Sequence, residues 1–108
     1  MARAVVEVHS GICGFVTNIT AVELGDGMVS IAIDSNCGNC RGLAGDLHEM
    51  DPMKLLVGKA KDNPIFAAAA RHPLHQACPV PIGVAKAVEV AAGLALPRNV
   101  EIKVEKVD

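Results

Sequence analysis

The chain has no tryptophan and no tyrosine, and Phe15 and Phe66 are its only aromatic residues. Proteins that bind single-stranded nucleic acids stack bases on aromatic side chains, so this kind of site is not expected here. A cationic block is also missing, because 12 acidic and 10 basic residues are scattered along the chain and give a net charge of −2. Without such a block the chain cannot neutralise a run of phosphates. We therefore expect no nucleic-acid partner.

Long apolar runs are absent as well. No run reaches the roughly 20 residues of a membrane-spanning helix, and residues 1–7 are too short and mixed to begin a signal peptide. We therefore expect a cytoplasmic protein with no membrane partner. The chain has 108 residues, of which 51% are hydrophobic. This is enough for one core, so we expect one domain over residues 1–108.

Alternating and β-branched residues predict three strands, at residues 3–8, 15–24 and 28–34, with a glycine-containing turn between the second and the third. The period then changes: Cys40, Leu43, Leu47 and Met50 recur every three or four residues and predict a helix that begins at the thiols, with Ser35 or Asn36 as N-cap. The first half of the chain is therefore expected to form antiparallel strands followed by a helix.

In the second half, capping residues followed by proline predict short helices at about 52–61 and 64–72. Cys78 and Pro79 open the longest predicted helix, and Gly93 offers its C-cap. Alternation over residues 100–104 predicts a last strand at the sheet edge. The fold class expected is α+β: a small, mostly antiparallel sheet of three or four strands with helices packed on one face.

Four cysteines lie at the predicted boundaries of these elements. Cys37 and Cys40 fall in the first turn of a helix, where unpaired backbone N–H groups and the helix dipole favour thiolate. Cys78 precedes another helix. Cys13 lies between Gly11 and Gly14, whose flexible backbone allows close approach. In the reducing cytosol such thiols indicate metal binding or redox chemistry more often than structural disulfides.

Thiolates with a histidine suit a tetrahedral zinc ion or an iron–sulfur cluster equally well. Cys13, Cys37 and Cys78 are the predicted ligands, and His75, three residues before Cys78, or Cys40 would complete the shell. Cys40 continues an apolar stripe, so it has an alternative place in the core. The sequence does not choose between the two metals.

In the order of its predicted elements and the spacing of its cysteines, the chain resembles the NifU/IscU family of iron–sulfur cluster scaffolds. The resemblance is that of a divergent prokaryotic branch of this family. Cys13-Gly14-Phe15 corresponds to the family's first ligand segment, the strand that ends in Cys37 to the second, and the segment from His75 to Cys78 to the third. The resemblance implies a SufE/NifU-like fold, a cluster bound by Cys13, Cys37 and Cys78, and a sulfur-donor or acceptor protein as partner. It covers about residues 10–92.

Three positions depart from the family pattern. Phe15 replaces the aspartate that makes the scaffolds' cluster labile, His75 is separated from its cysteine by two residues, and Cys40 has no counterpart.

The leading hypothesis is a metal-binding protein. No catalytic residue is assigned, so a binding role is favoured over catalysis.

Two other hypotheses stay open. Cys37 and Cys40 can form a thiol–disulfide couple, or Cys78 can carry a persulfide as a nucleophile at a helix start. In the third hypothesis the thiols are structural, and the last predicted strand pairs with a partner's sheet edge or in a homodimer.

Overall fold

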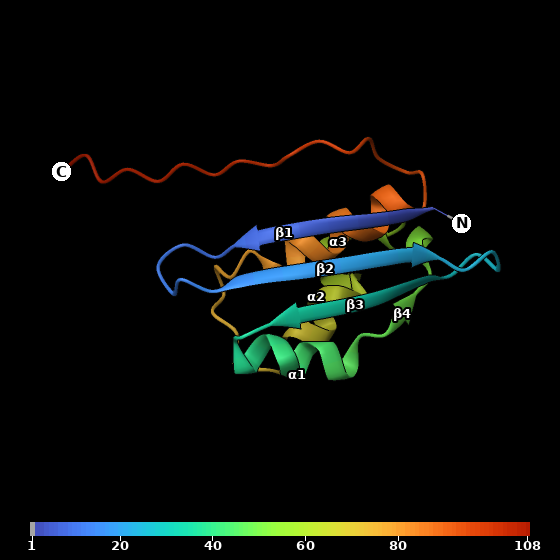
Figure 1. Ribbon diagram of the computed structural model, residues 1–108, viewed down its shortest axis with the longest axis horizontal. Helices are drawn as coiled ribbons and strands as arrows, with labels where there is room; N and C mark the ends of the chain where they lie inside the picture. Colours follow the sequence, from blue (N-terminus) through green and yellow to red (C-terminus); the bar gives the residue numbers. More distant parts are fainter. Residues whose placement is uncertain (1) are drawn as a thin grey trace.

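The computed structural model describes residues 2–108. Its centre is an antiparallel sheet in which each strand pairs with the next one along the chain (Figure 1). The strands are β1 (Arg3–His9), β2 (Val16–Glu23), β3 (Val29–Ser35) and the two-residue β4 (Glu49–Met50). The three long strands were predicted within one or two residues. The α+β class and the mostly antiparallel sheet of four strands are confirmed.

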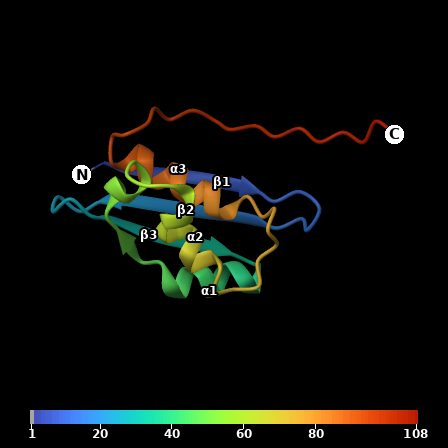
Figure 2. The ribbon, with the colours of Figure 1, turned by 180° about the vertical axis from the view of Figure 1, so that it is seen from behind.

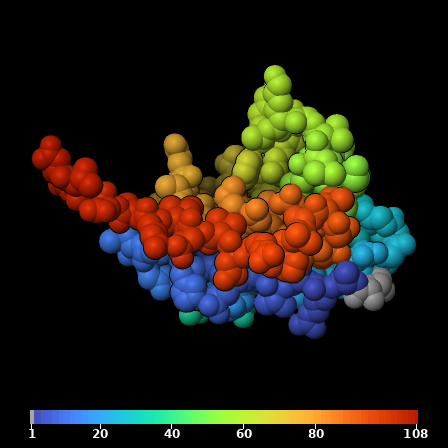
Figure 3. All heavy atoms as spheres, turned by 90° about the horizontal axis from the view of Figure 1, so that it is seen from above, coloured from blue at the N-terminus to red at the C-terminus, as the bar shows by residue number. Residues whose placement is uncertain are grey.

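The helices are α1 (Gly38–Asp46), α2 (Pro64–Ala69) and α3 (Val80–Ala91), and two 3₁₀ turns, η1 (Pro52–Leu55) and η2 (Ala60–Asp62), precede α2. Seen from behind, α3 and α2 lie over the sheet and α1 runs along β3 (Figure 2). From above, the strands form the lower layer and α3 lies on them (Figure 3). One face of the sheet is therefore covered, as predicted.

Strand alternation fixes which side chains enter the core. On β2, Thr17, Ile19 and Ala21 point to the helices and are buried, while the residues between them face the open side of the sheet. The helix α3 comes so close to this face that a Cβ atom on Gly83 would lie 2.5 Å from Val8 Cγ2. Glycine is therefore required where α3 rests on β1.

The turn between β2 and β3 follows the prediction. Gly25 and Gly27 have positive φ angles, 85° and 89°, which glycine adopts without strain. Between them, Asp26 Oδ1 accepts a hydrogen bond from the Met28 backbone N–H at 2.9 Å. This is the local side-chain bond typical of aspartate in turns.

The predicted last strand is wrong. Residues 94–108 have no strand assignment, and their chain runs beside β1 without pairing with it and ends beyond the sheet (Figures 1 and 2). Alternation alone does not make a strand, because a strand also needs a hydrogen-bonding partner. The fourth strand is instead β4, where Met50 pairs with Val29.

The prediction for residues 38–72 needs three corrections. The helix α1 ends at Asp46 because Leu47 leaves the helical region, so Met50 is buried from β4. The predicted helix at 52–61 is two 3₁₀ turns, separated near Gly58, whose φ is 89°. The predicted helix at 64–72 stops at Ala69. The N-cap of α1 is Cys37, one or two residues after the predicted caps.

Candidate functional site

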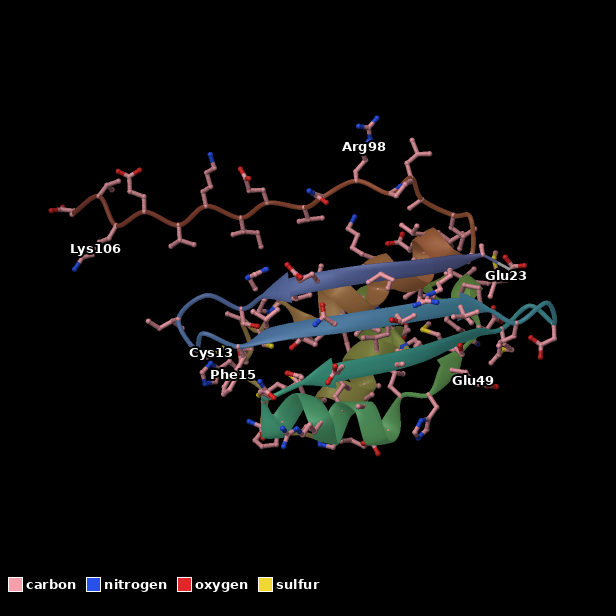
Figure 4. All side chains as sticks on the ribbon, in the orientation of Figure 1. Cys13, Phe15, Glu23, Glu49, Arg98 and Lys106 are labelled. Carbon is pink, nitrogen blue, oxygen red and sulfur yellow. The ribbon has the colours of Figure 1, made fainter. Side chains whose placement is uncertain are left out.

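Three cysteine-bearing junctions gather at one end of the sheet. The β1–β2 turn carries Cys13, the β3–α1 junction carries Cys37, and the loop into α3 carries Cys78 (Figure 1). Cys13 and Phe15 lie at this end (Figure 4). Within residues 2–108 the four cysteines are free thiols. They differ in burial, since Cys13 is exposed, Cys37 and Cys78 are half-buried, and Cys40 is only 2% exposed.

Cys37 is the N-cap residue of α1 and has an extended backbone. The pKa of its thiol is lowered from the ordinary 9.0, chiefly by the Cys40 backbone N–H, and further by the Asn39 N–H, the Cys40 thiol and the charge of Arg41. The two amides approach the sulfur without completing a capping hydrogen bond of good geometry. Their partial positive charge at the helix start nevertheless stabilises a thiolate. Cys37 is therefore the thiol prepared to act as a nucleophile.

Cys40 is one turn further along α1 and points into the core. The pKa of its thiol is raised to about 12, chiefly by burial and also by the neighbouring Cys37 and Cys78 thiols, while the Ser35 hydroxyl lowers it. Cys40 is thus protonated at neutral pH. The pair therefore combines a half-buried thiol whose pKa is lowered with a buried neighbouring thiol whose pKa is raised, which is the division of roles that dithiol exchange needs.

Two buried hydroxyls support this pair. Thr17 on β2 and Ser35 at the end of β3 are cross-strand partners, and Thr17 Oγ1 donates to Ser35 Oγ at 2.8 Å. Ser35 Oγ also accepts from the Cys37 backbone N–H at 3.1 Å. The sequence prediction treated Ser35 only as an N-cap and did not consider Thr17. The available signal was a hydroxyl at inward-facing positions of two neighbouring strands.

The loop that carries His75 and Cys78 is tied to α1 at both ends of the helix. Asn39 Nδ2 donates to the Pro73 carbonyl at 3.1 Å, and His72 Nε2 lies 2.6 Å from Asp46 Oδ2. The His72 hydrogen bond lowers the pKa of Asp46. These contacts hold the Cys78 loop beside the dithiol.

An open groove of about 420 Å³ follows this loop. Its wall includes Cys78, His75, Phe66 and Ile82. Most of the wall is apolar, and Cys78 contributes the thiol. The groove therefore adjoins the thiol site on the side of α2 and α3.

The predicted metal shell is not assembled in the described structure. Among residues 2–108, no group of three or more histidine, cysteine or acidic side chains is arranged to hold a metal ion. Cys13 and His75 are both exposed, and Cys37, Cys40 and Cys78 are the thiols that lie near one another. The assignment of Cys13, Cys37 and Cys78 as ligands, with His75 or Cys40, stays a prediction.

Comparison with known proteins places the chain in a family. Residues 4–104 match the model of DUF6951, described as a family of unknown function. The chain belongs to DUF6951. No curated protein and no solved structure matches it, so the SufE/NifU-like fold and the scaffold function stay predictions. Among residues 2–108, no helix combines the length and apolar character that crossing a membrane requires.

Proposed function

We propose that this chain is a dithiol redox protein in which Cys37 is the attacking thiol and Cys40 the resolving thiol. The observation that carries the proposal is the placement of a half-buried thiol at the start of α1 beside a buried thiol on the first turn of the same helix. A cytoplasmic protein would meet oxidised thiols of proteins or small molecules, and these are the proposed substrates.

The reaction has two exchange steps. The Cys37 thiolate attacks one sulfur of a substrate disulfide, the substrate S–S bond breaks, and one substrate thiolate leaves. The Cys40 sulfur then attacks Cys37, the mixed disulfide breaks, and the second substrate thiolate leaves while the Cys40 proton passes to water. The substrate gains two electrons, and the chain is left with a Cys37–Cys40 disulfide. A reduced dithiol must return it to the starting state.

A redox titration tests this function. The chain is equilibrated in mixtures of reduced and oxidised dithiothreitol, quenched with acid, alkylated and digested. We expect one disulfide between Cys37 and Cys40. It is detected as a mass lower by two hydrogens in the peptide that contains both cysteines. Cys37→Ser and Cys40→Ser should abolish it, and Cys13→Ser, which changes an exposed thiol outside the pair, should not. If no Cys37–Cys40 disulfide forms over the whole range, the proposal fails.

Metal binding is the second candidate, as predicted from the sequence. It is favoured by the third thiol, because Cys78 lies near enough to Cys40 for their charges to interact. Three soft donors suit zinc or an iron–sulfur cluster, and a cluster carrier would exchange it with a sulfur-donor or acceptor protein. The protein is therefore purified without oxygen and analysed for iron, zinc and acid-labile sulfide. Stoichiometric metal that is lost in Cys78→Ser would favour this candidate, and loss of the metal in Cys13→Ser would support Cys13 as the further ligand predicted from the sequence.

A further inference from the structure

Thr17 and Ser35 are hydroxyls in an otherwise aliphatic layer. Their exposed fractions are 0% and 7%, and both face the helices. Burying a hydroxyl is unfavourable unless it finds partners. Valine or alanine would fill such inward strand positions without that cost, so the hydrogen bonds of this pair need an explanation.

Ser35 Oγ accepts two hydrogen bonds. A serine hydroxyl accepts through two lone pairs and donates one proton. Thr17 Oγ1–H occupies one lone pair at 2.8 Å, and the Cys37 backbone N–H occupies the other at 3.1 Å. The Ser35 proton is therefore free to be donated to a third group. Cys40, on the first turn of α1, is a neighbouring side chain on which the Ser35 hydroxyl acts.

The position of Ser35 is also fixed through its backbone. The Ser35 carbonyl accepts from Arg41 Nε at 2.9 Å, which links the end of β3 to the first turn of α1. The hydroxyl is thus held by one strand, one helix amide and one arginine. Such a group can donate to the Cys40 sulfur without first reorganising.

We propose that Ser35 is a catalytic residue of the resolving step, in which its hydroxyl donates a hydrogen bond to the Cys40 sulfur, and that Thr17 positions this hydroxyl. This inference rests on the proposed dithiol function. Before Cys40 attacks Cys37, its proton is lost to water and its sulfur becomes negatively charged; as the Cys37–Cys40 bond forms, this charge passes to the leaving substrate sulfur. The Ser35 hydroxyl stabilises this charge on a sulfur that belongs to a buried residue.

Ellman's reagent separates the two steps. In the 108-residue chain with Cys13→Ser and Cys78→Ser, the Cys37 thiolate attacks the reagent and releases one equivalent of thionitrobenzoate. Cys40 then attacks the mixed disulfide and releases the second equivalent. The first absorbance phase therefore reports Cys37, and the second reports Cys40.

Ser35→Ala should slow the second phase about tenfold or more, because a hydrogen bond to a charged group is lost, and should change the first phase much less. Ser35→Thr, which keeps the hydroxyl, should restore the second phase. Thr17→Val has nearly the same shape as threonine and should slow the second phase by a smaller factor. Thr20→Val, on the open face of the same strand, is the matched control and should change neither phase.

The outcomes are distinguishable. A parent chain without a second phase would overturn the dithiol function and this inference together. A parent with two phases, and a folded Ser35→Ala with an unchanged second phase, would overturn the role of Ser35 alone. A Ser35→Thr chain as slow as Ser35→Ala would show that the hydroxyl is not responsible. If Ser35→Ala does not fold, an unchanged second phase in Thr17→Val overturns the proposed arrangement.

Discussion

Alkylation of the reduced chain should distinguish Cys37 from Cys40 by a large factor. Iodoacetamide reacts with the thiolate, so the rate follows the ionised fraction. A pKa of about 12 leaves about one Cys40 thiolate in 10⁵ at pH 7. The pKa of Cys37 is below 9.0, so more than about one molecule in 100 carries its thiolate. We expect Cys37 to react at least about 10³ times faster than Cys40, and burial of Cys40 adds to the difference.

Timed labelling at pH 7, followed by peptide mass spectrometry, measures both rates in one sample. Exposed Cys13 is the internal reference, and in urea the rates of Cys37 and Cys40 should become similar because burial and the helix start are lost. Raising the pH to 9 should increase the Cys40 rate about tenfold per unit, while the Cys37 rate levels off once its lower pKa is passed. If Cys40 in the folded chain reacts within a factor of ten of Cys37, the proposed division of roles is wrong.

Three further predictions concern stability. Gly83→Ala should lower the free energy of unfolding by about 1–3 kcal/mol, because its Cβ would lie 2.5 Å from Val8. Gly45→Ala, with no described atom within 4 Å of its Cβ, should instead add up to about 1 kcal/mol; thermal unfolding compares the two, and equal midpoints would contradict the close packing. The folded pKa of Asp46 is lowered by His72, so its stabilising contribution is present above the unfolded pKa of 3.8 and is lost as pH falls through the folded pKa. Asp46→Asn should therefore flatten the loss of stability in acid, and urea unfolding from pH 6 to 2 that shows an unchanged slope would refute this. Deleting residues 97–108 should change the free energy of unfolding, measured by urea titration, by no more than about 0.5 kcal/mol, because these residues are exposed. A larger loss would mean that the tail packs on the body.

Local signals predicted the elements well wherever one stretch of chain determines its own conformation. The glycines beside Asp26 determine the turn between β2 and β3, and Asn63 caps α2 through its bond to the Ile65 N–H, as predicted. The start of α3 after Pro79 was also predicted correctly. At the turn and at α2, the side chain that signals the boundary, Asp26 or Asn63, also makes the hydrogen bond that forms it.

Signals that depend on a distant partner were less informative. The alternation of residues 100–104 has the pattern of a strand, but no strand forms without an edge to pair with. The hydrogen bond between Thr17 and Ser35 depends on the register of β2 against β3, and this register cannot be read from the sequence. The sequence left Cys40 open as a metal ligand or a core residue, and the structure shows that Cys40 is buried in the core. That burial also raises the pKa of the Cys40 thiol. The core position of Cys40 is therefore also what sets its proposed role in the site.

The convergence of the cysteine-bearing junctions follows from the topology. In an antiparallel sheet whose strands pair in chain order, the first and third strands run in the same direction and finish at the same end of the sheet. Cys13 after β1 and Cys37 after β3 therefore share that end. Convergence of the junctions does not bring the side chains together, because Cys13 lies on a turn that projects from the sheet and stays exposed. Cys37 instead lies where a strand feeds directly into a helix, and the first helical turn folds Cys40 back toward it. The strand order therefore places the site at this end of the sheet, and the helix start selects which thiols act as a pair.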